Sequence, residues 1–134
     1  MKYMLDTNIC IYAIKKKSTN VIKKLLNCRI NDICISTITY SELRHGVEKS
    51  QYVERNRAAL TLFLSSISIL PFDSFAAEEY GKIRADLEKK GTPIGPMDLL
   101  IAAHAKSQDL ILVTNNTREF KRVNNLNIED WTIE

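Results

Sequence analysis

Short strand-like segments alternate with helical patterns along the chain, and this alternation constrains the fold more than any other feature of the sequence. The strand-like segments are residues 3–5, 33–35, 68–70, 110–113 and 128–133. Between them, apolar residues recur at the spacing of a helix face, as at Ala76, Tyr80, Ile83 and Leu87. Strands of this length separated by helices predict a parallel β-sheet covered by helices on both faces.

We expect one domain that spans residues 1–134. A chain of 134 residues is close to the usual size of a single domain. Glycine and proline concentrate only in residues 91–96, a segment too short for a flexible linker. This segment is therefore expected to be a shaped loop between two helices.

The composition excludes several classes of protein. No apolar run approaches the roughly 18 to 20 residues of a membrane helix, and Asp6 and Asn8 interrupt the first apolar stretch, which makes it a poor signal peptide. The three cysteines form no CxxC pair, and the two histidines lie far apart. These counts argue against a disulfide scaffold and a zinc site and favour a reducing compartment. We therefore expect a cytoplasmic protein that has no membrane partner.

The positive charge is concentrated in the first half of the chain. Residues 1–60 carry 11 Lys and Arg against 5 Asp and Glu, a balance of +6, whereas residues 61–134 carry 8 against 11, a balance of −3. A basic half of this kind can attract a polyanion such as RNA. The alternative is that Lys15, Lys16, Lys17, Lys23 and Lys24 only solvate two helix surfaces.

Three carboxylates lie close to the predicted ends of strands or starts of helices. Asp6 follows the first strand, Glu42 lies in the helix after the second, and Asp98 lies two residues after a proline that starts a late helix. Each has an ordinary structural explanation: Asp6 as a helix N-cap, Thr39 and Glu42 as a capping box, and Asp98 as a charge that complements the helix dipole.

Taken together, the three carboxylates support a stronger hypothesis. In a doubly wound sheet these elements begin at one edge, where ligands gather at the carboxyl ends of the strands. Carboxylates crowded there repel one another, and a cation would neutralise that repulsion. Oxygen ligands without nearby Cys or His select Mg²⁺, with Mn²⁺ as a possible substitute. A metal held in this way beside a basic flank suggests phosphodiester hydrolysis.

Four blocks of the sequence are similar to a known family. The blocks are MLDTNICIYAI, ITYSELRHGVEKS, RADLEKKGTPIGPMDLLIAAHA, and LVTNNTREFKRV followed by LNIEDW. In this order and spacing they resemble the PIN-domain ribonucleases, and most closely the VapC toxins of bacterial toxin–antitoxin pairs. The resemblance covers nearly the whole chain. It implies an α/β fold, namely a three-layer α/β/α sandwich with a short, mainly parallel central sheet.

The resemblance also implies a set of catalytic residues. The acidic positions of the family fall on Asp6, Glu42 and Asp98, which would hold Mg²⁺ directly or through water. A fourth position, often Asp in the family, falls on Asn116. Its amide supplies less negative charge, which leaves a second tightly held metal in question. Glu119, three residues further on, is a candidate for a contact through water.

The function that the resemblance implies is an Mg²⁺-dependent endoribonuclease that cleaves single-stranded or looped RNA, such as a tRNA, and arrests translation. It also implies a homodimer and inhibition by a small VapB-like antitoxin. The main alternative is a PIN-like module that binds RNA or protein without catalysis. A receiver-type signalling domain is a more distant alternative, because the sequence lacks paired acids after the first strand and an acceptor Asp after a central strand.

Overall fold

The structure, a computed structural model, describes residues 1–133. Its elements follow one another as β1 (Tyr3–Leu5), α1 (Thr7–Ile14), α2 (Thr19–Asn27), a short 3-10 helix (Ile30–Asp32), β2 (Ile33–Ser36), α3 (Thr37–Glu48), α4 (Val53–Leu64), β3 (Ser68–Leu70), α5 (Ser74–Lys90), α6 (Pro96–Ser107), β4 (Ile111–Val113), α7 (Thr117–Phe120) and β5 (Ile128–Glu129). Within residues 1–133, no helix combines the length and the apolar character needed to cross a membrane.

The five strands form one sheet in the order β3-β2-β1-β4-β5. Every pairing is parallel, with Tyr3 of β1 in register with Ile33 of β2 on one side and Ile111 of β4 on the other. The predicted parallel sheet is therefore confirmed, and it is parallel throughout the described strands. The chain builds outward from β1 to β3 and then returns to place β4 on the opposite side of β1.

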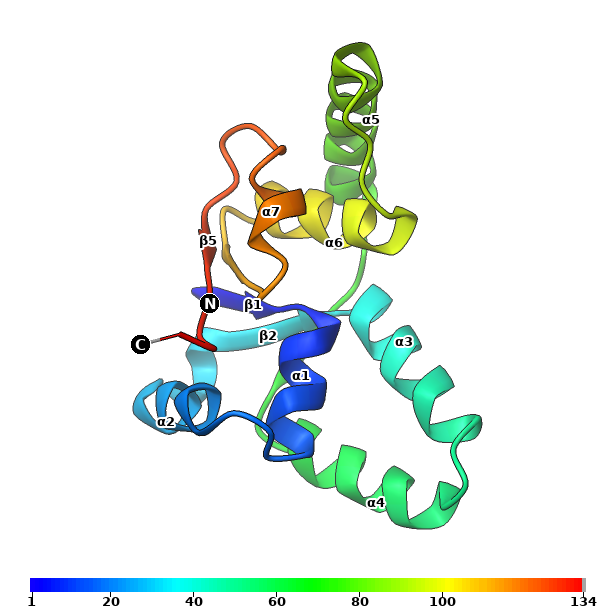
Figure 1. Cartoon of the computed structure of the whole chain (residues 1–134), viewed down its shortest axis with the longest axis vertical. Coiled ribbons are helices and arrows are strands. Elements are labelled where there is room, and N and C mark those ends of the chain that lie inside the picture. Colours follow the sequence, from blue (N-terminus) through cyan, green and yellow to red (C-terminus); the bar gives the residue numbers. More distant parts are fainter. Residues whose placement is uncertain (134) are drawn as a thin grey trace.

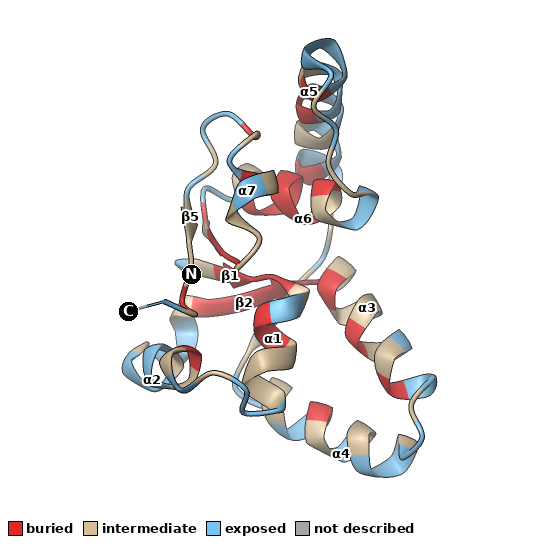
Figure 2. Cartoon of the chain, in the orientation of Figure 1, coloured by how far each residue is buried: buried red, intermediate tan, exposed pale blue. Residues whose placement is uncertain are grey.

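Alternate residues of the central strands contribute to different faces of the sheet. Met4 and Leu112 pack with α5 and α6 on one face, whereas Leu5 and Val113 pack with α1, α3 and α4 on the other. Figure 1 shows α5, α6 and α7 on one side of the sheet and α1, α2 and α4 on the other. In Figure 2 the buried residues follow the strands and the inward faces of these helices. The three-layer α/β/α sandwich is thus confirmed.

Two local expectations differ from the structure. The helix α3 begins at Thr37 and is capped by the Ser36 hydroxyl, which accepts a hydrogen bond from the backbone N–H of Ile38 at 3.1 Å. The capping box expected at Thr39 is therefore wrong, because the helix starts too early for Thr39 to cap it. The fifth strand is shorter than the expected 128–133 and ends at Glu129.

We predict that Leu112→Ala destabilises the fold by roughly 2 to 5 kcal/mol. Leu112 is fully buried between β1 and β5, so its truncation leaves a cavity that rigid strands on both sides cannot fill. Leu26→Ala is the matched control, since Leu26 is 79% exposed on α2. Urea unfolding followed by circular dichroism measures both. Equal stability of the two variants would contradict the packing described above.

Candidate active site

The candidate site lies where the order of strands changes direction, between β1 and β4. In open α/β sheets, ligands bind in the crevice beyond the carboxyl ends of the strands at such a point. Asp6 directly follows β1, and residues 114–116 directly follow β4. Glu42 lies in α3, which follows β2, and Asp98 lies in the first turn of α6. The topology thus brings four separate segments to one edge of the sheet.

Asp6 is a buried carboxylate with a raised pKa. It is 4% exposed, and its side chain caps α1 by accepting a hydrogen bond from the backbone N–H of Ile9 at 2.9 Å. Burial raises the pKa of Asp6 to about 6, and the negative charge of Glu42 adds to this effect, while hydrogen bonds from Thr114 and Ile9 oppose it. The N-cap role is confirmed, but the capping bonds do not offset the cost of burying the charge.

Asp98 is the second carboxylate whose pKa is raised to about 6. Burial is the largest cause, followed by a hydrogen bond with Glu119, and the charges of Glu119, Asp6 and Glu42 add to it. Asn116 donates from its Nδ2 to Glu119 Oε2 at 2.7 Å and to Asp98 Oδ2 at 3.4 Å. Its amide nitrogen therefore lies between two carboxylates. In this arrangement Asn116 offers them N–H groups rather than its carbonyl oxygen.

The side chain of Glu42 forms a hydrogen bond with Thr7. The Thr7 hydroxyl donates to Glu42 Oε1 at 2.5 Å, which joins the start of α1 to the first half of α3. The charge of Glu42 still raises the pKa of both Asp6 and Asp98. Within residues 1–133, no group of three or more Asp, Glu, His or Cys side chains is close enough to form a metal cluster as the side chains stand. Binding a shared cation would require these carboxylates to move closer together.

The donor set of the site fits a hard divalent cation. Among the residues that the structure describes, none of Asp6, Glu42, Asp98 and Glu119 lies within 4.0 Å of a Lys, Arg or His nitrogen, so their mutual repulsion is not offset by an ion pair. Carboxylate oxygens are the ligands that Mg²⁺ and Mn²⁺ prefer. The residues present therefore fit the metal that the sequence suggests.

Two helices that carry acidic residues are joined through a buried histidine. His104 of α6 is fully buried, and its Nδ1 forms a hydrogen bond of 2.7 Å with the Ser36 hydroxyl, which also caps α3. Burial lowers the pKa of His104, so the ring stays neutral at neutral pH. The ring of Phe72 packs edge-on against it at 5.5 Å. His104 therefore has a structural role in the core.

Sequence reasoning missed one acid near the site. Asp130 directly follows β5, and its charge contributes to the raised pKa of Asp6. The available signal was an acid at the carboxyl end of a strand, the same signal that identified Asp6. The sequence did not place Asp130 at a strand end, because the fifth strand was expected to run through position 130.

A groove of about 1050 Å³ begins at the acidic site and runs between α1, α3 and α4. Thr7, Glu42 and Met97 line it at the acidic end. Its other lining residues include apolar side chains and four basic ones, which are Lys15, Lys16, Lys49 and Arg55. A polyanion can therefore approach the carboxylates along a surface of opposite charge.

Comparison with known families identifies the class of this protein. The sequence pattern of the PIN domain matches residues 3–126. That range includes Asp6, Glu42, Asp98 and Asn116, together with all strands except β5. The chain belongs to the PIN domain family.

Similar proteins place the chain more narrowly within that family. It is 51% identical over 132 residues to the tRNA(fMet)-specific endonuclease VapC of Shigella flexneri, covering 98% of this chain and 99% of that protein. It is 48% identical over 131 residues to ribonuclease VapC2 of Haemophilus influenzae, covering 98% of each. The VapC-type ribonuclease expected from the sequence is therefore confirmed.

Solved structures agree with this assignment. The DNA-bound VapBC of Salmonella typhimurium matches with a TM-score of 0.92 and 49% identity, over 98% of each chain. VapBC2 of Rickettsia felis bound to a fragment of promoter DNA matches with a TM-score of 0.92 and 44% identity, over 98% of this chain and 99% of that one. The fold of this chain is thus that of VapC proteins solved in VapBC complexes.

We predict that Asp6→Asn stabilises the metal-free protein at pH 7.5 and not at pH 3.5. The folded-state pKa of Asp6 is raised from 3.8 to about 6, so stability falls as the pH rises through this window and the cost is complete above it. Removing the charge should recover roughly 2 to 3 kcal/mol at pH 7.5, since Asn also caps helices well. Urea unfolding in EDTA at the two pH values measures the gain.

The matched control is Asp109→Asn, which removes the charge of an exposed carboxylate in the turn before β4. It should leave stability within roughly 0.5 kcal/mol of the wild type at both pH values. A gain from Asp6→Asn that is equal at pH 3.5 and 7.5 would show that the charge of Asp6 carries no cost in the folded state.

Proposed function

We propose that this chain is an Mg²⁺-dependent endoribonuclease that cleaves single-stranded or looped RNA, with tRNA as its target, and so inhibits translation as the toxin of a type II toxin–antitoxin pair. The observation that carries the proposal is the gathering of Asp6, Glu42 and Asp98 at one edge of the sheet, where within residues 1–133 no Lys, Arg or His nitrogen lies within 4.0 Å of them. The tRNA target is supported by the name of the Shigella flexneri relative, a tRNA(fMet)-specific endonuclease.

Each residue of the site would have its own role in the reaction. Asp6, Glu42 and Asp98 would hold Mg²⁺, and Mn²⁺ would be able to replace it. The bound ion would supply a hydroxide at neutral pH and stabilise charge on the phosphoryl oxygens. Thr7 would orient Glu42 through its hydroxyl, and Asn116 would hold the Asp98 carboxylate by its amide N–H groups. Cleavage would break the bond from phosphorus to the 3′ oxygen and leave 5′-phosphate and 3′-hydroxyl ends.

The proposed partners are a VapB-like antitoxin and a second copy of this chain. Structures similar to this one were solved as VapBC complexes, which supports the antitoxin. Exposed apolar side chains support a homodimer, and among the described residues they include Leu62, which is 75% exposed, and Phe75, which is 66% exposed. We place the protein in the cytoplasm, where its RNA substrate resides and where its free cysteines remain reduced.

We predict that Asp98→Asn lowers the rate of RNA cleavage at least roughly 100-fold. The substitution keeps the size of the side chain and removes a metal ligand. Gel analysis of bacterial tRNA incubated with the protein and Mg²⁺ measures the rate, with EDTA as the metal-free reaction. Asp109→Asn serves as the control, because it removes an exposed carboxylate outside the site and should cleave like the wild type.

Two outcomes would contradict the proposed function. Equal cleavage by wild type and Asp98→Asn would mean that the activity belongs to a contaminant. Binding of tRNA without any cleavage in Mg²⁺ would favour a non-catalytic module, in which Asn116 replaces the fourth acid and the site no longer holds a catalytic metal.

A further inference from the structure

The segment from α1 through α2 carries basic residues and no acidic ones. From residue 7 to residue 31 the chain contains six Lys and Arg and no Asp or Glu. Within residues 1–133, none of these six forms an ion pair. The five lysines among them are exposed, at the end of α1 and on α2. Positive charge on these two helices is therefore not neutralised by the fold.

The charge on α2 differs from that on the long helix α5. Three of its basic residues have acidic partners on the same helix: Lys82 with Glu79, Arg84 with Glu88, and Lys90 with Asp86, the last at 3.0 Å. Both helices are rich in lysine, yet only α5 balances its charge. The imbalance on α2 favours an external anion as the partner.

One face of α2 consists of residue types that often contact nucleic-acid backbones in other proteins. Asn20, Lys23, Lys24 and Asn27 follow the spacing i, i+3, i+4 and i+7, which puts them on one side of the helix. Lysine and asparagine side chains are frequent donors to phosphate and sugar oxygens. This set of residues is called the α2 face below.

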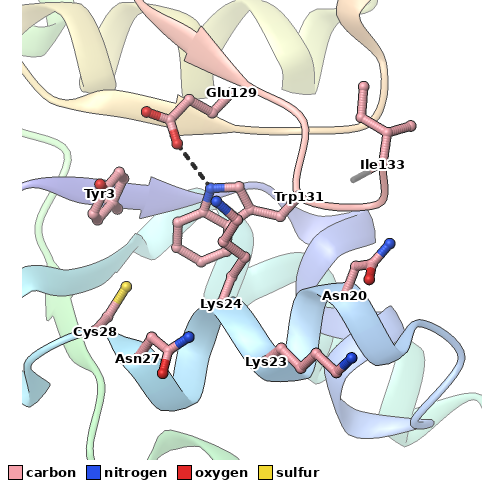
Figure 3. A pocket seen from close by; sticks show the side chains of 9 residues that line it. All are labelled: Tyr3, Asn20, Lys23, Lys24, Asn27, Cys28, Glu129, Trp131 and Ile133. Atoms are coloured by element: carbon pink, nitrogen blue, oxygen red, sulfur yellow. Dashed lines mark hydrogen bonds between the residues drawn. The ribbon is translucent and has the colours of Figure 1, made fainter.

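The α2 face lines a hollow of about 370 Å³. Figure 3 shows the side chains of the α2 face together with those of Tyr3, Trp131 and Ile133. Tyr3 belongs to β1, and Trp131 and Ile133 follow β5. Among the described residues that line the hollow, the acidic one is Glu129, whose Oε1 accepts a hydrogen bond from the indole N–H of Trp131 at 2.9 Å. Glu129 lies more than 4.0 Å from either lysine nitrogen. The hollow therefore presents two unpaired ammonium groups on a shaped surface.

The α2 face is separated from the catalytic carboxylates by the length of α1. Asp6 caps the start of that helix, and Lys15 caps its end. A helix of eight residues is about 12 Å long, and α2 lies beyond it. A dinucleotide, which carries one bridging phosphate, would not reach from the acidic site to the α2 face, whereas a folded RNA the size of a tRNA would.

We propose that the α2 face binds the phosphate backbone of a structured RNA at a distance from the cleavage site, and so selects large folded RNA over short strands. This inference rests on the proposed ribonuclease function and adds a second contact surface to it. Its basis is charge complementarity: two lysines that form no ion pair within residues 1–133 lie in a concave surface and would face a polyanion. The amides of Asn20 and Asn27 flank them, and Asn20 also donates to the backbone carbonyl of Thr132 at 3.3 Å. An acidic protein segment is the competing occupant.

The test compares Lys23→Gln/Lys24→Gln with the matched control Lys89→Gln/Lys90→Gln. Both pairs are adjacent, exposed lysines near the end of a helix, so the two variants lose equal charge. Fluorescence anisotropy in EDTA measures binding of labelled bacterial tRNA and of a labelled RNA dinucleotide by the full chain. Thermal unfolding checks that both variants are folded.

We expect the α2 variant to bind tRNA roughly tenfold more weakly than the wild type and the slope of log affinity against log salt to shrink by about 1.5. Dinucleotide binding should change less than about twofold. The control should bind both RNAs like the wild type. Unchanged tRNA affinity, an equal loss in the control, or an equal loss for the dinucleotide would each overturn the proposal.

A third probe, poly-glutamate, represents an acidic protein. Loss of poly-glutamate binding by the α2 variant alone, with tRNA binding unchanged, would assign the surface to a protein partner and overturn the proposal. Cleavage in Mg²⁺ is measured in parallel. If the wild type binds tRNA through the α2 face but does not cleave it, the proposed function fails and the α2 surface stands.

Discussion

Repulsion among carboxylates at the junction of β1 and β4 is the constraint on which the candidate site depends. Asp6 and Asp98 are both placed where burial and neighbouring charge raise the pKa to about 6. A fold does not gain stability from such an arrangement, because ionising each group costs free energy at neutral pH. A divalent cation bound there, as we propose, would offset that cost, since it would replace repulsion with coordination. The burial of these charges lowers the stability of the metal-free chain at neutral pH.

The rest of the structure holds these acids in place. The sheet order puts β1 and β4 side by side, and α1 and α6 begin at its edge. His104 and Ser36 link α6 to the start of α3 inside the core. Rigid support of this kind keeps a catalytic group within a fraction of an ångström of its working position. The charged surfaces of α1 and α2 then lie on the same side of the sheet as the groove that opens at the acids.

Much of the fold was predictable because the central strands β1, β2 and β4 are buried on both faces and read as short apolar runs. The fifth strand was not, because Asp130 accepts a hydrogen bond from the backbone N–H of Thr132 at 2.8 Å and forms a local turn that ends the ladder. Asp6 followed from the rule for strand ends, and Asp98 from its place in the first turn of a helix that a proline starts. The contact of Thr7 with Glu42 and the orientation of Asn116 did not, since they depend on side chains that meet only in the folded chain.

The most direct test of the central claim is an NMR titration of the side-chain carboxyl groups of Asp6 and Asp98, in EDTA and in saturating Mg²⁺. In EDTA both groups should titrate with pKa values of about 6, and Mg²⁺ should move both pKa values well below that, because the cation favours the charged form. Titration near the ordinary value of about 4 in EDTA, or curves that do not move when Mg²⁺ is added, would contradict the account.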